Sequence, residues 1–115
     1  MRHHAVGRKF GRLKGKRKSF VQGLISNLIM ENSIMTTEAR AKEIRPRVEK
    51  LVTLAKKSNI ASLRILLKRL PRPAAMRLYY DVAPRYKERK GGYTRIIKAG
   101  RRMRDAAPKA CIQFV

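Results

Sequence analysis

Apolar residues recur at helical spacing through the first two thirds of this 115-residue chain. Steps of one, three and four residues place them on one side of a helix, and this predicts four amphipathic helices. We expect these helices at residues 16–32, 37–57, 60–70 and 73–83. Their apolar stripes are Phe20, Val21, Leu24, Ile25, Leu28 and Ile29; Ala41, Ile44, Val48, Leu51, Val52 and Ala55; Leu63, Leu66, Leu67 and Leu70; and Met76, Tyr79, Tyr80 and Ala83.

Polar residues and prolines mark the expected ends of these helices. Ser19 with Gln22 fits a capping box, with a helix start one turn earlier as the alternative, and Thr37 suits the N-cap of the second helix. Pro84 ends the fourth helix, because proline cannot continue the backbone hydrogen bonds. Pro46 lies inside the second pattern, and the periodicity continues beyond it. We therefore expect a kink at Pro46 rather than a helix end.

The last third changes to strand-like spacing. Residues 93–99 and 110–115 predict two strands, joined by a basic loop at residues 100–109 as a long hairpin. Residues 34–36 are long enough for one edge strand. These elements predict an α+β fold, with about four helices packed on a small mixed three-stranded sheet. The length allows a single domain at residues 19–115, after a basic extended N-terminal arm at residues 1–18.

The charge balance indicates a polyanionic partner. Lys and Arg number 30 against 7 Asp and Glu, a formal net charge of +23. Self-repulsion at this density opposes compaction, and a partner with spaced phosphates relieves it. Nucleic acid is the first candidate and an anionic membrane surface the second. Core packing explains the apolar stripe of the first helix better than a membrane does, and no apolar run is long enough to cross a bilayer.

The basic residues gather in two stretches. The arm at residues 1–18 has eight Lys or Arg and no acid, so we expect it to order on a phosphate backbone; a merely solvated basic tail is the alternative. The second stretch, residues 85–104, has nine Lys or Arg against one acid, and its Gly91-Gly92 pair allows close approach of backbone to phosphate. Tyr86 and Tyr93 either stack on unpaired bases or anchor the loop to the core.

Catalytic and metal-binding patterns are absent from the sequence. His3 and His4 are adjacent in the arm, which is a poor arrangement for acid–base catalysis. The single Cys111 fits a reducing compartment, and its place in the last strand favours a small core residue over a nucleophile. We expect no enzyme activity, no cofactor, no metal and no small-molecule substrate. Without a helix-turn-helix pattern, DNA binding would be nonspecific packaging.

Several short motifs run in order along almost the whole chain. They are Met1-Arg2-His3, Gly7-Arg8, Gly11-Arg12, Thr36-Thr37, Ala41-Lys42-Glu43-Ile44-Arg45-Pro46, Glu49-Lys50-Leu51-Val52-Thr53-Leu54-Ala55-Lys56, Ala83-Pro84-Arg85-Tyr86, Gly91-Gly92-Tyr93-Thr94-Arg95-Ile96 and Asp105-Ala106-Ala107-Pro108. With these motifs at family spacing, the chain resembles the bacterial large-subunit ribosomal protein seventeen family. It departs from many relatives at Lys16-Arg17, where they have His-Arg, and at Arg104, where they have Gly.

The resemblance implies a structural protein of the large ribosomal subunit, found on ribosomes in the cytoplasm. The implied partners are large-subunit ribosomal RNA and neighbouring large-subunit ribosomal proteins near the exit of the peptide tunnel. No membrane is implied as a partner.

Charge and resemblance together predict the residues that bind RNA. Among the second stretch, arginine is ranked above lysine because it pairs with phosphate bidentately and stacks on bases. The predicted residues are Arg2, His3, His4, Arg8, Lys9, Arg12, Lys14, Lys16, Arg17 and Lys18 in the arm, and Arg89, Lys90, Tyr93, Arg95, Arg101, Arg102 and Arg104 in the second stretch.

Overall fold

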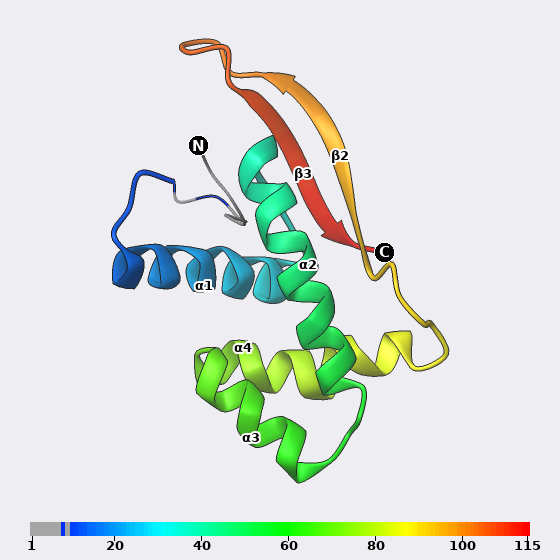
Figure 1. Cartoon of the computed structure of the whole chain (residues 1–115). Coiled ribbons are helices and arrows are strands. Elements are labelled where there is room, and N and C mark those ends of the chain that lie inside the picture. The colour runs from blue at the N-terminus through cyan, green and yellow to red at the C-terminus, as the bar shows by residue number, and fades with distance from the viewer. Residues whose placement is uncertain (1–7, 9) are drawn as a thin grey trace, which may run out of the picture.

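Helices packed on a small sheet form the protein in a computed structural model, which describes Arg8 and residues 10–115 (Figure 1). The α+β prediction is therefore confirmed. The elements in chain order are α1 (Lys14–Glu31), β1 (Ser33–Thr37), α2 (Glu38–Ala55), α3 (Ile60–Arg69), α4 (Arg72–Arg77), the π-helical segment η1 (Leu78–Val82), the 3-10 helix η2 (Ala83–Tyr86), β2 (Thr94–Arg101) and β3 (Pro108–Phe114).

The sheet has the strand order β1-β3-β2, and both ladders are antiparallel. The expected mixed sheet is thus wrong in detail. A hairpin joins β2 to β3, and β1 reaches the other side of β3 from the end of α1, which makes all pairs antiparallel. The strands extend further into the hairpin than expected, so that the connecting loop is only residues 102–107. Gly100, with φ of 81°, lies at the irregularity between Lys98 and Arg101.

The two faces of the sheet have different surroundings. Ala110 and Ile112 of β3 are fully buried, on the face that α2 covers (Figure 1). Cys111 lies between them in sequence and therefore on the opposite face, where it pairs in register with Met35 and Ile97. Both of these neighbours are exposed and Cys111 is half-buried. The expectation that Cys111 is a core residue is wrong, because the register of β3 turns its side chain outward.

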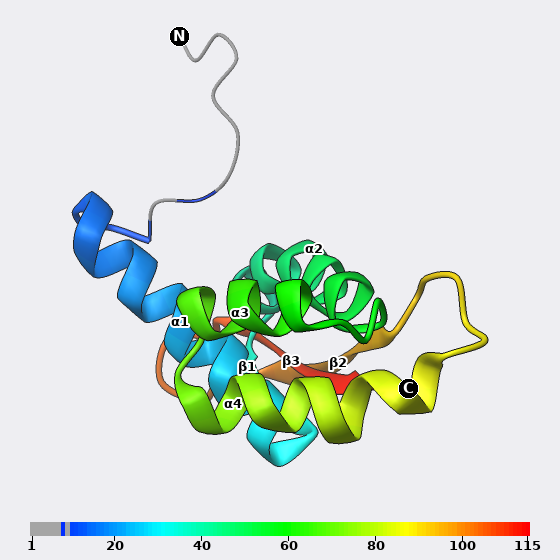
Figure 2. The same ribbon diagram turned by 90° about the horizontal axis from the view of Figure 1, so that it is seen from below.

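Helix α2 forms the centre of the core. Its predicted stripe is buried from Ala41 to Ala55, and the Thr37 hydroxyl accepts a hydrogen bond from the Arg40 amide at 3.3 Å. The helix runs through Pro46 without ending there, as the periodicity predicts. Helices α3 and α4 pack on each other at the end of the molecule away from the hairpin tip (Figures 1 and 2).

Helix α1 begins before the candidate capping box, as the alternative of an earlier start has it. Its first residue is Lys14, and Leu13 occupies the N-cap position without a side-chain hydrogen bond. The capping box at Ser19 and Gln22 is therefore wrong, and residues 14–18 of the expected extended arm are helical. The predicted apolar stripe holds, with four of its residues buried and Phe20 and Leu24 packed against the core. Asn32 ends the helix in the left-handed conformation, with φ of 66°.

The fourth helical segment is longer and rotated relative to the prediction. It continues from Arg72 to Tyr86 through η1 and η2, and Pro84 lies at the start of a 3-10 turn rather than beyond the helix. Tyr80, expected inside, is 63% exposed, whereas Leu78 and Val82 are buried. The buried side is defined by Ala74, Ala75, Leu78 and Val82, and a regular helical period already places Tyr80 opposite them. The prediction was therefore centred on the wrong side of this helix.

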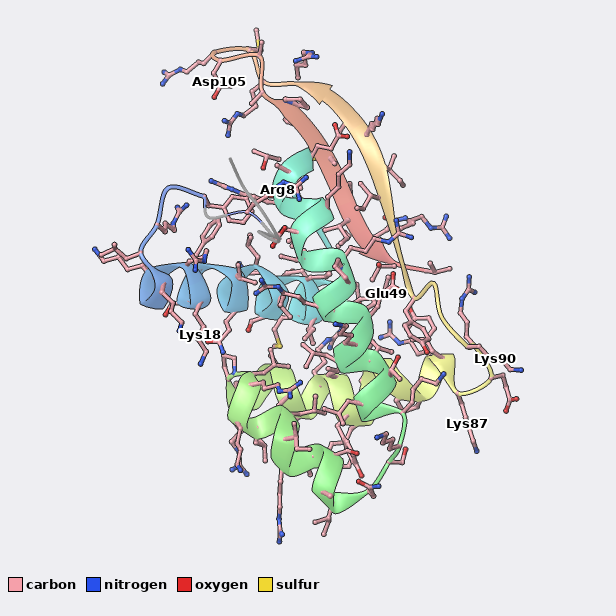
Figure 3. The ribbon with its side chains drawn as sticks, viewed as in Figure 1. Arg8, Lys18, Glu49, Lys87, Lys90 and Asp105 are labelled. Carbon is pink, nitrogen blue, oxygen red and sulfur yellow. The ribbon has the colours of Figure 1, made fainter. Side chains whose placement is uncertain are left out.

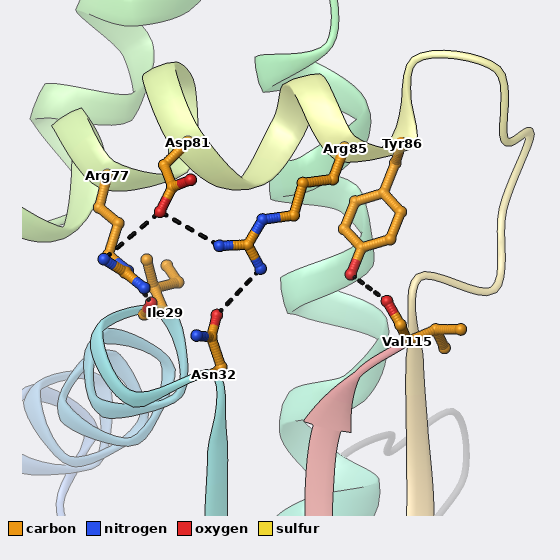
Figure 4. Close-up of polar contacts among 7 residues, drawn as sticks. All are labelled: Ile29, Asn32, Arg77, Asp81, Arg85, Tyr86 and Val115. Carbon is orange, nitrogen blue, oxygen red and sulfur yellow. Dashed lines mark hydrogen bonds and ion pairs between the residues drawn. The ribbon is translucent and has the colours of Figure 1, made fainter.

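Polar contacts tie this segment to the ends of α1 and β3 (Figure 4). The Arg77 guanidinium donates to the Ile29 carbonyl at 2.8 Å, which lies in the last turn of α1. Arg85 donates to the Asn32 side-chain oxygen at 3.2 Å and pairs with Asp81 at the same distance. The Tyr86 hydroxyl donates to the carbonyl of Val115 at 2.8 Å. The C-terminus is thus held against the helical part of the core.

Candidate nucleic-acid interface

Five of the seven acidic side chains form ion pairs within the fold. Glu38, Glu43, Glu49, Asp81 and Asp105 each pair with Lys or Arg, at distances from 2.6 to 3.6 Å. The sequence has far more cations than acids, so most of the Lys and Arg in the described ranges have no acidic neighbour. The charge of this surface therefore remains available to an external anion.

Aromatic contacts hold two arginines at the start of α1. The guanidinium carbon of Arg12 lies 3.8 Å from the centroid of the Phe20 ring, and that of Arg40 in α2 lies 4.9 Å from the same centroid. Phe10 packs edge-on against Phe20, with ring centroids 5.5 Å apart. Arg12 also donates to the Phe10 carbonyl at 2.9 Å. The two cations are thus positioned before any partner arrives, because Phe20 and its neighbour fix their orientation.

Arg8 has a structural partner. Its guanidinium pairs with Glu43 at 3.2 Å, and its backbone amide donates to the same carboxylate at 3.3 Å. Glu43 is only 9% exposed and also pairs with Arg47 at 3.6 Å. A buried carboxylate needs such partners, because burial without them is costly. Arg8 therefore anchors its segment to α2, with part of its charge already neutralised.

The tip of the hairpin is a rigid turn. The Arg102 guanidinium donates two hydrogen bonds, of 3.1 and 2.6 Å, to the Asp105 carboxylate. Arg101 donates to the Ala106 carbonyl at 2.9 Å. The Asp105 carboxylate also accepts from the Ala107 amide at 3.1 Å. The hydrogen bond from Arg102 lowers the pKa of Asp105, and the same contact raises the pKa of Arg102. Arg104 is exposed at the tip beside Met103.

The tip and the N-terminus of α2 together enclose a cationic hollow. A depression of about 270 Å³ is lined by Thr36, Thr37, Arg40, Arg102 and Lys109, together with Met35. Arg40 belongs both to this hollow and to the Phe20 cluster. A continuous surface therefore runs from the start of α1 across α2 to the hairpin. We call this surface the cationic strip and define it by Arg12, Arg40, Arg102 and Lys109.

The two tyrosines of the second basic stretch are core anchors. Tyr93 is 2% exposed and Tyr86 is 4% exposed, with ring centroids 5.4 Å apart. Lys56 donates to the Tyr93 hydroxyl at 3.0 Å and to the Arg89 carbonyl. This hydrogen bond lowers the pKa of Tyr93, whereas burial raises the pKa of Tyr86. The expectation that Tyr93 offers its face to a base is wrong in this structure, because the ring is enclosed.

The second basic stretch does not form one site. Arg89 and Lys90 lie at the foot of the hairpin, and Arg101, Arg102 and Arg104 lie at its tip. The intervening strand β2 has 8 residues and spans about 25 Å at the usual rise. Figure 3 shows Asp105 at the tip of the hairpin and Lys90 beyond the opposite end of its strands. Arg95 lies between them on the outer face of the sheet, opposite Gln113.

The remaining predicted residues fall into two groups. Arg17 donates to the Arg12 carbonyl at 3.4 Å, and Lys14, Lys16 and Lys18 are exposed on the first turns of α1. Arg2, His3, His4 and Lys9 lie outside the described residues.

Sequence reasoning missed Arg40 and Lys109 as interface residues. Arg40 lies in the second predicted helix outside its apolar stripe, and Lys109 lies in the predicted loop at residues 100–109. Neither belongs to an acid-free run, so charge density did not single them out. For Lys109, the only signal in the sequence was the alternation of inward and outward side chains along the last strand. The position of Arg40 beside the hairpin depends on how α2 packs on the sheet.

Other kinds of site are not indicated in the part of the chain that the structure describes. Within Arg8 and residues 10–115, no cluster of three or more His, Cys, Asp and Glu side chains is arranged to hold a metal ion. None of the helices described is long and apolar enough to span a bilayer.

Fold and surface together define a small, strongly basic α+β protein in which most acids form ion pairs within the fold and most cations have no acidic partner. Comparison with known proteins identifies the family. Residues 20–115 match the profile of the family described as Ribosomal protein L17. The chain belongs to the ribosomal protein L17 family, which confirms the resemblance seen in its motifs.

Individual relatives carry the same description. The "Large ribosomal subunit protein bL17" of Sphingopyxis alaskensis is 51% identical over 116 residues, covering 100% of this chain and 84% of that protein. The protein of the same name from Thermodesulfovibrio yellowstonii is 45% identical, covering 100% and 87%. That of Oenococcus oeni is 42% identical over 127 residues, covering 94% and 97%. The similarity thus covers at least 94% of this chain and at least 84% of each of these relatives.

Proposed function

We propose that this protein is a structural constituent of the large ribosomal subunit that binds and stabilises large-subunit ribosomal RNA. The observation that carries the proposal is family membership over almost the whole chain, together with a formal charge of +23 that the fold does not neutralise. Its place of action is the ribosome in the cytoplasm. No catalytic role is part of the proposal.

The cationic strip is the proposed centre of RNA binding. Arg12 and Arg40 both lie over the Phe20 ring, and Arg102 is held by Asp105, so these three side chains are preorganised. The pair with Asp105 offsets part of the charge of Arg102, as Glu43 does for Arg8, whereas Arg12 and Arg40 have no acidic partner in the described ranges. Preorganised cations bind a phosphate with less loss of rotamer entropy than free ones. The hollow between Arg40, Arg102 and Lys109 has room for a phosphate group, with Thr36 and Thr37 as hydroxyl neighbours.

The expected contributions of the arm and the hairpin are revised by the structure. Lys14, Lys16, Arg17 and Lys18 reach RNA from helix α1 rather than from an extended chain. Arg2, His3, His4 and Lys9 remain proposed contacts of the N-terminal arm. At the hairpin, Arg104 and Arg101 reach RNA from the tip, Arg95 from the outer sheet face, and Arg89 and Lys90 from the foot. Tyr93 supports the foot from within the core, and neighbouring large-subunit proteins near the tunnel exit complete the proposed surroundings.

Sedimentation tests the proposed function. Cells are lysed, ribosomal subunits are separated on a sucrose gradient in moderately high salt, and each fraction is probed for this chain. We expect it to travel with the large subunit at about one copy per particle. Recovery at the top of the gradient, with chromosomal DNA or with membrane would overturn the proposal.

A further inference from the structure

A second hollow lies outside the cationic strip, between α1, α2 and the end of α3. Its volume is about 360 Å³. The floor consists of Val21 and Ile25 from α1, Leu51 from α2 and Leu70 after α3, all of them part of the core and 2 to 6% exposed. The hollow therefore offers an apolar surface that the fold itself leaves open to solvent on one side.

The rim of this hollow is entirely basic or neutral. It consists of Lys18 and Gln22 on α1, Arg47 and Lys50 on α2 and Arg69 on α3, with no acid among the lining residues. Within the described ranges, Lys18, Lys50 and Arg69 form no ion pair, and only Arg47 has an acidic partner. Lys18 extends from the side of α1 that faces α3 and α4 (Figure 3). An occupant must therefore combine an apolar surface with negative charge.

The rim is also preformed. The Gln22 side-chain amide donates to the Arg69 carbonyl at 2.9 Å, which links α1 to the last turn of α3 across the hollow. The floor residues pack in the core on their other side. A hollow with a fixed floor and a linked rim loses little entropy when it is filled.

We propose that this hollow binds the base of an unpaired RNA nucleotide, whose phosphate is held by the cations of the rim. A base has a flat aromatic face whose removal from water is favourable. It is joined through one sugar to a negatively charged phosphate. The volume lies near the lower end of the range for small-ligand sites, so it suits one nucleotide and is too small for a helix of another protein. The inference rests on the proposed function, because ribosomal RNA supplies the nucleotide.

Crosslinking in intact large subunits tests the inference. Purified subunits are irradiated with ultraviolet light and digested with nuclease and protease, and nucleotide adducts on this chain are mapped by mass spectrometry. We expect a single-nucleotide adduct on residues 18–25, 47–51 or 69–70. In parallel, a carbodiimide that joins amines directly to carboxylates is applied to intact subunits. Linkage of Lys18 or Lys50 to a carboxylate of another protein would identify an acidic protein segment as the occupant and overturn the inference.

Two charge-reversal variants supply a matched comparison. Lys50→Glu places an acid on the rim, and Lys68→Glu makes the same charge change at an exposed position of α3 that does not line the hollow. We expect the adduct yield to fall about tenfold in Lys50→Glu relative to Lys68→Glu, with both variants still present in the subunit. Equal yields, or adducts confined to other parts of the chain, would overturn the inference while leaving the proposed function standing. Absence of the wild-type chain from large subunits would instead remove the proposed function, and the inference with it.

Discussion

At the scale of single residues, the acids of this protein determine which cations are available to RNA. Glu43 is the clearest case, because it is nearly buried and is shared by Arg8 and Arg47. Arg8 is therefore committed to the fold, whereas Arg12 and Arg40 rest on an aromatic ring and keep their full charge. A chain with so few acids thus uses them to place particular arginines.

Replacing Glu43 with Gln should release the segment around Arg8. The substitution keeps the shape but removes the charge that pairs with Arg8, whose side chain is 46% exposed. We expect faster trypsin cleavage after Arg8 and a loss of about 1 kcal/mol in the free energy of unfolding. Limited proteolysis followed by mass spectrometry gives the cleavage rates. The control is Glu31→Gln, at an exposed acid that forms no ion pair within the described ranges; equal rates in the two variants would contradict an anchoring role for Glu43.

At the scale of elements, the hairpin tip and helix α2 each contain one feature that sets their stability. The tip is closed by the pair of Arg102 and Asp105, on a turn in which Ala106 has φ of 55°. Helix α2 contains Pro46, which cannot donate a backbone hydrogen bond to the preceding turn. The two features lead to opposite predictions. The pair of Arg102 and Asp105 stabilises the hairpin tip, whereas Pro46 weakens α2.

The hairpin tip should open in acid. The pKa of Asp105 is lowered in the folded protein, first by its hydrogen bond from Arg102. A lowered pKa means that the carboxylate stabilises the tip fully above its ordinary pKa of about 3.9, and that this contribution is lost as the pH falls through the folded value. We expect the amide resonance of Ala107, which donates to Asp105, to titrate with a midpoint below about 3.9 in an NMR experiment. The titration should vanish in Asp105→Asn. A midpoint at or above the ordinary value would contradict the pairing.

Replacing Pro46 with Ala should stabilise the protein. Pro46 is exposed within an 18-residue helix, and proline in a helix interior costs about 3 kcal/mol relative to alanine. Part of this gain is offset because alanine also gives the unfolded chain more freedom, so we expect an increase of about 1–2 kcal/mol in urea unfolding. Lys50→Ala, at an exposed position of the same helix, should change stability by less than about 0.5 kcal/mol. A decrease in Pro46→Ala would mean that the turn before residue 46 is not helical in solution.

At the scale of the whole molecule, packing turns scattered cations into a surface. Arg12, Arg40 and the hairpin pair Arg102 and Lys109 come from three separate parts of the chain, and they lie together only because the hairpin folds back over the N-terminus of α2. Conversely, β2 separates Arg89 and Lys90 from the tip by its full length. The molecule therefore presents cations at several places around its core rather than at one site.

The salt dependence of RNA binding should show whether the residues of the cationic strip contact phosphates. For isolated full-length protein and a fragment of large-subunit RNA, contact with six to ten phosphates predicts a loss of about 10³–10⁵ in affinity between about 50 and 200 mM salt. Arg40→Gln should lower the slope of log K against log salt by about 1. Lys68→Gln removes an equal charge outside the strip and should leave the slope within about 0.3 of the wild type. Identical slopes for Arg40→Gln and Lys68→Gln would contradict a specific role for the strip.

Hydrophobic periodicity predicted most of the helices and strands correctly. The stripes of the first two helices, the N-cap at Thr37, the hairpin and the α+β class are all confirmed, because each depends on the geometry of nearby residues. The errors lie where local spacing does not fix which side of a helix is buried or where the helix begins. Tyr80 was expected on the buried side of the fourth helix and is exposed, and α1 starts at Lys14 without a side-chain cap.

The sequence by itself determined the helices, the number of strands and the excess of positive charge, since these follow from spacing and composition. Only the tertiary structure decided which face of β3 is buried, and so that Cys111 points outward and Lys109 borders the cationic hollow. It also enclosed Tyr93 beside Tyr86 and brought Arg40 to the hairpin tip. The physical reason is that strand register and helix packing are set by contacts between residues far apart in the chain, and local spacing carries no information about which distant residues will meet.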